Sequence, residues 1–478
     1  MSDARKIIEQ LKTTIVSNRL PIKLTEEEGN WTVVSGTGGL ITALAPVLKN
    51  RGGTWIGWPG APIDDELERL MSEKSSEIGF NLKTVSLDED EINGYYHGFS
   101  NEALWPLFHD LLDHCNFDMS YWEYYQTANY KFAKAIADNS PRDDFIWVHD
   151  YQLILVGHFL REMGFNKTAF FLHIPFPSKD IYMKLPWRRE ILEGLLSYRL
   201  IGFQTERDRR NFIQCLRHLL PEAQISHHRK YPFIKHNNHT CRIGAFPISI
   251  DFAQLNEFSK SKEVTDAAWL FHENFQEQKI ILGIDRLDYT KGIPLRLGAF
   301  KNCLQRYPEL KGKITLVQLV VPSRTEVPEY QALKKQIDEM VGRINGEFTE
   351  PGWIPIHYIY GTLSTADLFG AYRSSEIALI TPLKDGMNLV AKEYCTACTE
   401  DIGVLILSEF AGAASQLGNG AILVNPYNIE EVADAVFTAF YMSIEEQKER
   451  MSRMRLSIRK DHVFKWVEQF ISSFSYTD

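Results

Sequence analysis

The sequence has little of several features that would assign a protein class at once. No run of about eighteen apolar residues occurs, so we expect no transmembrane helix. Only six cysteines are scattered through 478 residues, which favours a reducing compartment and a cytoplasmic protein. Basic residues do not outnumber acidic ones. The formal net charge of −10 argues against general nucleic-acid binding, which needs a basic face.

Cofactor signals are also missing. No strand is followed by a GxGxxG fingerprint, which weakens a dehydrogenase interpretation. Residues 221–243 are rich in histidine but lack the Cys/His spacing of a zinc site, so we expect a solvated loop and no metal. Cys395 and Cys398 have redox-like spacing, yet they lie in an expected helix without a second pair, which favours a structural role.

What the chain does have is a repeated strand–loop–helix pattern. Its 44% apolar and 24% charged residues are typical of a globular protein, and its length exceeds one ordinary core. The alternation starts near residue 13 and restarts after 244–251, which we interpret as a linker. We therefore predict an α/β fold with doubly wound domains at 1–247 and 248–460, the first joined by a C-terminal helix over 461–478.

The segment from Lys384 to Tyr394 is the strongest candidate site. An apolar stretch, 377–383, predicts a buried strand before it, and Asn388 is a good N-cap for a helix that begins with Leu389. A strand, a tight turn and a helix N-terminus together form an anion site. Asp385 could hold a sugar hydroxyl, and Glu393 a ribose diol. An ordinary βα turn with a solvated acid explains the segment equally well.

Cations follow two other strands of the second half. Arg286 and Lys291 come after the strand expected at 279–283, and Arg324 follows the strand expected at 314–321. A lone arginine in a loop is normally solvent-facing, but three cations at strand ends favour a pyrophosphate site.

Polar residues also follow strands in the first half. The stretches 145–151, 169–177 and 201–205 are apolar strands that end in polar residues, where open α/β sheets bind ligands. The glycines of 35–40 could let backbone approach a phosphate, although a plain loop explains them as well. Aromatic residues at 53–58 and 95–105 suit a sugar pocket, but such residues are more often core.

These motifs together resemble those of the trehalose-6-phosphate synthase family. The matching stretches, from about residue 13 to about 465, are Val16–Pro21, Trp147–Tyr151, His173–Pro177, Asp285–Gly292, Val321–Arg324 and Lys384–Tyr394. The resemblance implies a GT-B architecture, with two Rossmann-like domains facing a central cleft and without a cofactor or metal. It implies retaining transfer of glucose from UDP-glucose to glucose 6-phosphate, giving α,α-trehalose 6-phosphate and UDP.

The resemblance also implies residue roles. The N-terminal domain would bind the acceptor and the C-terminal domain the nucleotide sugar. Implied donor-binding residues are Gly38, Gly39, Arg286, Lys291, Leu368, Asp385, Gly386, Met387, Asn388, Leu389, Val390 and Glu393. Implied acceptor-binding residues are Arg19, Trp55, Tyr96, Trp105, Asp150, Tyr151, Gln204 and Arg324. The catalytic group would comprise Asp150, His173 through its main-chain carbonyl, Arg286, Lys291 and Asp385.

No carboxylate pair stands out as an acid and a nucleophile. The family is thought to use front-face substitution, in which catalysis is mostly positioning and charge stabilisation. Departures from the family pattern, such as Gln152 in place of a common histidine, lie in the expected acceptor half. Alternatives are a glucosylglycerol-phosphate synthase using glycerol 3-phosphate, or a non-catalytic regulatory subunit that senses sugar phosphates. The sequence leaves open whether the protein forms a homo-oligomer.

Overall fold

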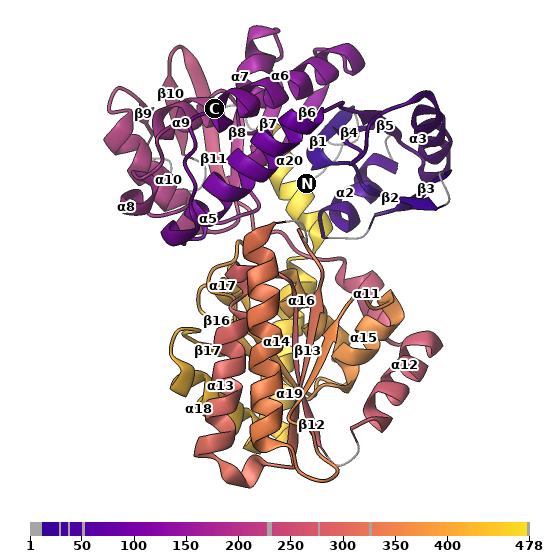
Figure 1. Ribbon diagram of the computed structural model, residues 1–478. Helices are drawn as coiled ribbons and strands as arrows, with labels where there is room; N and C mark the ends of the chain where they lie inside the picture. The colour runs from indigo at the N-terminus through magenta and orange to yellow at the C-terminus, as the bar shows by residue number, and fades with distance from the viewer. Residues whose placement is uncertain are drawn as a thin grey trace. The chain divides into compact units, whose positions relative to one another are not determined.

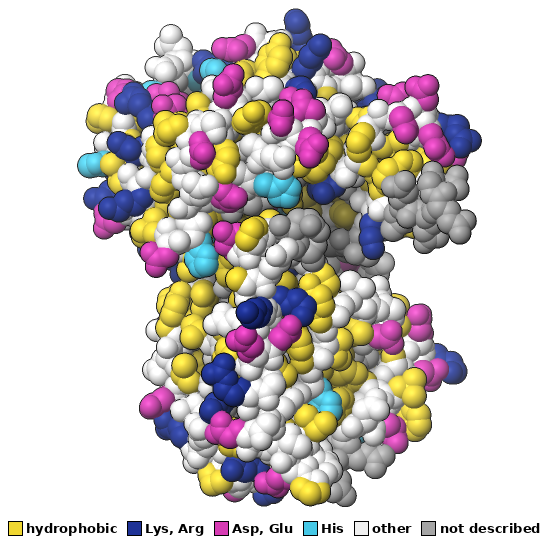
Figure 2. All heavy atoms as spheres, viewed as in Figure 1, with side chains coloured by type: hydrophobic (Ala, Val, Ile, Leu, Met, Phe, Trp, Pro, Cys, Tyr) yellow, Lys and Arg dark blue, Asp and Glu magenta, His cyan; other side chains and the backbone are white. Residues whose placement is uncertain are grey.

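The computed structural model describes residues 12–27, 30–36, 39–49, 53–226, 232–275, 278–324 and 327–475. The chain forms two compact units. Unit 1 comprises Met1–Ile248 with Phe464–Asp478, and unit 2 comprises Ser249–Val463. No helix in the described ranges combines the length and apolar character that a membrane span needs. On the face shown in Figure 2, acidic and basic side chains are interspersed.

Unit 1 is built on a nine-stranded sheet with the order β5-β4-β1-β6-β7-β8-β11-β10-β9. Its strands are β1 (Thr13–Arg19), β4 (Thr54–Trp58), β5 (Asn81–Thr84), β6 (Phe145–His149), β7 (Thr168–Phe171), β8 (Leu200–Phe203), β9 (Gln224–Ile225), β10 (Phe233–His236) and β11 (His239–Ala245). From β5 to β8 the strands are parallel and have the 3-2-1-4-5-6 order of a doubly wound fold. The order reverses between β1 and β6, which is where such folds bind ligands.

The edge of this sheet formed by β11, β10 and β9 differs from two of our expectations. Within residues 221–243, the described part is not a solvated loop, because β10 and β11 form an antiparallel hairpin. Asn237 and Asn238 join them with φ of 47° and 56°, the left-handed conformation that a two-residue type I′ turn requires. β11 also pairs with β8, so Gly244 and Ala245 are strand rather than linker.

Helices cover the sheet of unit 1, and a separate hairpin is formed by β2 (Ile22–Glu27) and β3 (Asn30–Ser35). The helices are α2 (Gly39–Lys49), α3 (Asp65–Ile78), α4 (Glu89–Glu91), the π-helix η1 (Ile92–Leu104), α5 (Trp105–Phe108), α6 (Tyr121–Asn139), α7 (Val156–Glu162), α8 (Lys179–Tyr182), α9 (Arg188–Leu196) and α10 (Glu206–Leu219). Within the predicted C-terminal segment 461–478, the structure has the helix α20 (Val463–Ser475). Its Trp466 and Phe470 pack on Trp147 of β6, with ring centroids 5.1 and 4.4 Å apart, so α20 contributes to the core of unit 1. In Figure 1, α20 is the yellow helix beside the strands of unit 1.

Unit 2 contains a parallel six-stranded sheet with the order β14-β13-β12-β15-β16-β17. Its strands are β12 (Lys279–Arg286), β13 (Ile314–Val321), β14 (Ile356–Tyr360), β15 (Ile377–Ile380), β16 (Val404–Ser408) and β17 (Ile422–Val424). The strand expected at 314–321 is confirmed, whereas β15 ends three residues before the predicted 383. This sheet also has the doubly wound order, and it reverses between β12 and β15.

Helices flank the sheet of unit 2 on both faces (Figure 1). They are α11 (Phe252–Ser259), α12 (Lys262–Glu273), α13 (Ile293–Arg306), α14 (Pro328–Phe348), α15 (Thr365–Ser374), α16 (Leu389–Ala397), α17 (Ala414–Leu417), α18 (Ile429–Tyr441) and α19 (Ile444–Lys460). Apolar residues of α13, α14 and α18, among them Leu297, Ile337 and Val436, bury one face of the strands. The double winding thus places the β12 and β15 carboxyl ends side by side.

Candidate active site

The turn between β15 and α16 is the predicted anion-binding element. Asn388 has φ of 76°, and its side-chain oxygen accepts from the backbone N–H of Ala391 at 3.0 Å. The helix therefore begins at Leu389, as the N-cap prediction requires. The loop after β16 holds the turn from outside, because the N–H of Gly412 donates to the carbonyl of Asp385 at 3.1 Å and that of Ala413 to Met387 at 2.7 Å.

Two of the predicted catalytic residues, Lys291 and Asp385, are in contact at the point where the strand order of unit 2 reverses. Lys291 Nζ lies 2.6 Å from Asp385 Oδ2, and the two side chains are 13% and 16% exposed. Asn388 Nδ2 donates to the same carboxylate oxygen at 3.2 Å. Arg286, the last residue of β12, is exposed. Cations beside a helix N-terminus suit a diphosphate, and a carboxylate among them suits a sugar hydroxyl.

A second ion pair, more deeply buried than the first, was missed by the sequence analysis. Arg296 Nη1 is 2.5 Å from Asp285 Oδ2, and the two side chains are only 0% and 3% exposed. Arg296 also donates to Thr381 Oγ1 at 3.0 Å and to the Lys291 carbonyl at 3.4 Å. It therefore ties the loop after β12 to the loop after β15. An arginine within the apolar face of α13, next to Leu297, was the available signal.

Arg324 lies in unit 2, with φ of 49°. Its guanidinium donates to the Tyr330 hydroxyl and lies 4.0 Å from Asp288 Oδ2. Burial would raise the pKa of Asp288, but the charges of Arg324, Lys291 and Arg286 outweigh that effect and hold the pKa below its usual value. A group of cations thus stabilises one buried carboxylate beneath the strand ends. The implied acceptor role of Arg324 stays a prediction.

The other implied donor-binding residues that the structure describes lie on α2, on α15 and in the segment 386–393. Glu393 accepts from the Tyr372 hydroxyl at 3.1 Å, and burial raises its pKa while that hydrogen bond opposes the shift. Leu368 is half-buried on α15, as are Leu389 and Val390 at the start of α16, whereas Gly386 and Met387 are buried. Gly39 opens α2 in unit 1, and Gly38 lies outside the described residues. Their donor roles stay predictions.

In unit 1, Arg19 stands at the carboxyl end of β1. Its guanidinium carbon lies 4.0 Å from the ring centroid of Trp58, which ends the neighbouring β4. Tyr96 approaches the same indole, with ring centroids 6.0 Å apart. Gly60 has φ of 98°, and a Cβ there would come within 1.6 Å of Arg19 Nη1, so only glycine leaves space for this guanidinium. Trp58 belongs to the aromatic stretch 53–58 but was given no role of its own, and Gly60 was missed by the sequence analysis.

The aromatic segment 95–105 forms the π-helix η1 and the start of α5. A thirteen-residue π-helix is unusual, because π-turns mostly occur singly and often at functional sites. Asn101 of η1 accepts from the Tyr151 hydroxyl at 2.8 Å and donates to the Tyr96 carbonyl at 2.7 Å. Trp105 packs on Tyr151 with ring centroids 5.6 Å apart. One amide therefore joins the helix that carries Tyr96 to the strand end that carries Tyr151.

Asp150 follows β6 in a strained conformation, with φ of 75° and ψ of 167°. Residues other than glycine rarely adopt this region, at a cost of about 1–3 kcal/mol, and such strain clusters at functional sites. The Asp150 carboxylate accepts from the backbone N–H of His173 at 3.1 Å. Gln204 donates to the His173 carbonyl at 3.4 Å. The ends of β6, β7 and β8 are thereby connected through predicted site residues.

Trp55 differs from the other predicted aromatics. It is 1% exposed, and its indole N–H donates to Ser17 Oγ at 2.8 Å. Ser17 in turn donates to the Arg19 carbonyl at 2.6 Å. Trp55 therefore supports the strand that carries Arg19 from within the core, and Trp58 is the indole beside the guanidinium.

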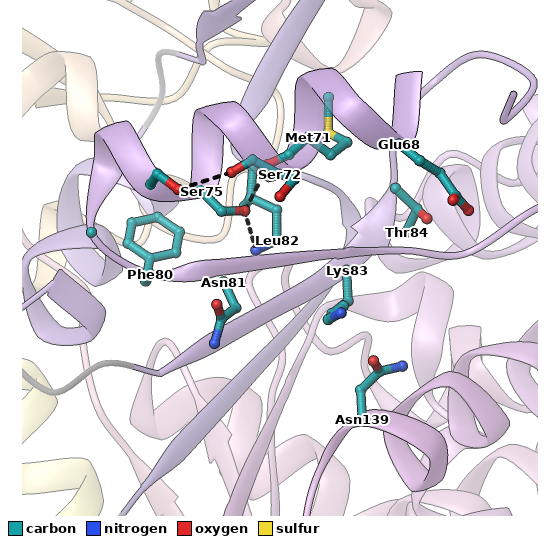
Figure 3. A pocket seen from close by; sticks show the side chains of 12 residues that line it. Glu68, Met71, Ser72, Ser75, Phe80, Asn81, Leu82, Lys83, Thr84 and Asn139 are labelled. Carbon is teal, nitrogen blue, oxygen red and sulfur yellow. Dashed lines mark hydrogen bonds between the residues drawn. The ribbon is translucent and has the colours of Figure 1, made fainter. Parts of the chain in front are cut away.

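Unit 1 also contains a pocket of about 610 Å³ (Figure 3). It is lined by α3, by the edge strand β5 and by Asn139, and it includes none of the predicted site residues. Ser75 accepts from the Leu82 N–H at 3.0 Å and donates to the Met71 carbonyl at 2.7 Å. The serine thus covers a backbone donor of an edge strand, which limits pairing with another strand.

Comparison with known proteins identifies the family of the chain. The model of glycosyltransferase family 20 matches residues 11–476. The chain belongs to glycosyltransferase family 20. Within the family it is 41% identical over 461 residues to alpha,alpha-trehalose-phosphate synthase [UDP-forming] A of Dictyostelium discoideum, covering 96% of this chain but only 61% of that protein. It is also 41% identical to the alpha,alpha-trehalose-phosphate synthase [UDP-forming] of Candida albicans, covering 97% of both chains.

Solved structures of family members superpose on nearly the whole chain. An alpha,alpha-trehalose-phosphate synthase (UDP-forming) from Burkholderia xenovorans, in complex with glucose-6-phosphate, matches with a TM-score of 0.87 and 32% identity over 97% of this chain and 100% of that one. An E. coli structure bound with UDP-2-fluoro glucose matches with a TM-score of 0.86 and 34% identity over 98% and 99%. The predicted family and the α/β fold of the GT-B class are confirmed.

Proposed function

We propose that this family 20 glycosyltransferase moves glucose from UDP-glucose to glucose 6-phosphate with retention, giving α,α-trehalose 6-phosphate and UDP. The reaction would be the first step of trehalose biosynthesis. Two matching proteins support the substrate pair, because one is bound to glucose-6-phosphate and the other to UDP-2-fluoro glucose. The names of the Dictyostelium and Candida relatives support UDP as the product.

The observation that carries this proposal is the pairing of Lys291 with Asp385 at the switch point of unit 2. The two side chains lie 2.6 Å apart and neutralise each other. A UDP-glucose molecule offers a partner to each, since its diphosphate is anionic and its glucose carries hydroxyl donors. Arg286 and the N-terminus of α16 add positive charge for the diphosphate, and Glu393 is our candidate for the ribose.

The acceptor roles rest on unit 1. Arg19, fixed over Trp58, is the cation for the acceptor phosphate, and Tyr96 lies beside it. Asp150, Tyr151, Trp105 and Gln204 line the neighbouring strand ends and suit the hydroxyls and the apolar face of a sugar. We propose unit 1 for the acceptor and unit 2 for the nucleotide sugar.

The chemistry that fits these residues is front-face substitution. The bond between the glucosyl C1 and the diphosphate oxygen breaks as the acceptor hydroxyl forms a bond to C1 on the same face. The leaving diphosphate takes the hydroxyl proton, so no carboxylate nucleophile is needed. Lys291 and Arg286 stabilise the charge that grows on the diphosphate, and this electrostatic effect supplies most of the rate enhancement.

A cytoplasmic location is part of the proposal. All six cysteines are free thiols, and five of them are buried. Free thiols of this kind are typical of a reducing compartment.

The proposal is tested by a donor-by-acceptor activity matrix. UDP-, ADP- and GDP-glucose are each combined with glucose 6-phosphate, glycerol 3-phosphate or no acceptor, and release of the nucleoside diphosphate is measured. We expect release from UDP-glucose to depend on glucose 6-phosphate. Release driven by glycerol 3-phosphate but not by glucose 6-phosphate would refute the acceptor assignment. If none of the three donors releases its nucleoside diphosphate, catalysis is refuted.

A further inference from the structure

Two histidines form a hydrogen-bonded pair behind the strand ends of unit 1. His149 ends β6 and His173 follows β7, and the neighbouring strands place His149 Nδ1 3.0 Å from His173 Nε2. Nothing in the expected reaction requires His149, which is 0% exposed. The pair lies among the rings of Trp147, Phe171 and Trp466.

Both imidazoles are neutral at physiological pH. Burial lowers the pKa of His173 to about 3. It lowers the pKa of His149 as well, and the neighbouring His173 adds to that shift. Each ring therefore carries one proton, and the hydrogen bond between them needs one donor nitrogen and one acceptor nitrogen.

The surroundings of His149 decide which nitrogen donates. Its Nε2 is buried and has no hydrogen-bond partner among the described residues. A buried N–H without a partner is rarer and more costly than a buried acceptor without one. The proton of His149 therefore belongs on Nδ1, which faces His173, and the lone pair belongs on Nε2.

We propose that His149 is a positioning residue: its Nδ1–H donates to Nε2 of His173 and so fixes His173 as the Nδ1–H tautomer. His173 is then held at three points, because Asp150 accepts from its backbone N–H and Gln204 donates to its carbonyl. The inference rests on the proposed function in one respect. With Nε2 engaged by His149, the Nδ1–H is the ring donor that His173 keeps for another partner, which in the proposed reaction would be an oxygen of the bound sugar.

The tautomer is tested directly by two-bond ¹H–¹⁵N spectra of protein labelled at histidine. Signals of the pair are assigned by their loss in His149→Asn and His173→Asn. We expect both rings to show a protonated Nδ1 and an unprotonated Nε2. A protonated Nε2 on His173 would overturn the proposal. Because the spectrum is recorded without substrates, it decides the tautomer even if no acceptor supports turnover and the proposed function fails.

The kcat values of two His149 variants distinguish a positioning role of His149 from simple structural support. In His149→Asn the amide N–H replaces the donor at Nδ1, whereas in His149→Gln the amide reaches the place of Nε2. One lost hydrogen bond of the usual size lowers kcat by about tenfold, so we expect that loss in the Gln variant and at most about threefold in the Asn variant. Equal losses in both would overturn the proposal. His239→Asn is the matched control, since His239 bonds the Tyr198 carbonyl at the amino end of β11.

Discussion

Asp385→Asn is the most informative single substitution, because it keeps the shape of the side chain and removes its charge. In the proposed complex Asp385 accepts a hydroxyl of the transferred glucose, and a hydrogen bond to a charged acceptor is worth about 1.5–3 kcal/mol. We therefore expect kcat/KM for UDP-glucose to fall about 10- to 150-fold. UDP lacks the glucose, so it should bind the variant as tightly as the wild type. Its inhibition constant should even fall if Lys291, having lost its partner, becomes available to the diphosphate.

The effect on stability should be small, because the Lys291–Asp385 pair is partly exposed, at 13% and 16%. Pairs near the surface contribute about 0–1 kcal/mol. A change of that size shifts the melting temperature of a unit this large by no more than about 4 °C. The charge of Asp385 therefore contributes mainly to function.

The matched control is Asp285→Asn, one loop away. Its partner Arg296 is fully buried, and a buried cation left without its carboxylate costs about 3–5 kcal/mol. The melting temperature of this control should fall by about 6–20 °C. Melting is followed by calorimetry, and kinetics are measured by UDP release. Donor kinetics of Asp385→Asn within about twofold of wild type would refute the assignment, and so would a melting temperature as low as that of Asp285→Asn.

Three other substitutions test neighbouring parts of the structure. Gly60→Ala adds a Cβ that would come within 1.6 Å of Arg19 Nη1, so KM for glucose 6-phosphate should rise at least about tenfold with little change for UDP-glucose. Gly412→Ala adds a Cβ that would come within 1.9 Å of the Gly386 carbonyl, so KM for UDP-glucose should rise while that for the acceptor stays near wild type. Burial lowers the pKa of Lys392 to about 7, with Asp461 opposing the shift. Because the unfolded chain binds more protons than the native one above pH 7, wild-type stability should gain from this group as the pH rises from 7 to 10. Melting curves of Lys392→Met should lack that gain, and an identical pH dependence in both proteins would contradict the buried lysine.

Local signals in the sequence predicted much of unit 2. An apolar stretch, a polar turn and Asn388 before Leu389 were enough to place a strand, an anion-binding turn and the first residue of α16. The end of β15 was predicted too late because Leu383, although apolar, hydrogen-bonds the carbonyl of Thr290 in another loop. Apolar character alone does not separate a strand from a well-packed loop.

Other features depend on how separate elements pack against each other. The buried Arg296 reaches from α13 back to Asp285 of β12, eleven residues earlier, and the His149–His173 bond exists because β6 and β7 are neighbours in the sheet. No local pattern predicts either contact. The hairpin of β10 and β11, in contrast, has a local signal in Asn237-Asn238, although we expected residues 221–243 to form a solvated loop.

The configuration of the product tests the central claim most directly. Purified protein is incubated with UDP-glucose and glucose 6-phosphate, and the product is examined by proton NMR at its anomeric signals. The account predicts α,α-trehalose 6-phosphate, with both anomeric centres in the α configuration. A β linkage, or free glucose beside unchanged glucose 6-phosphate, would contradict it.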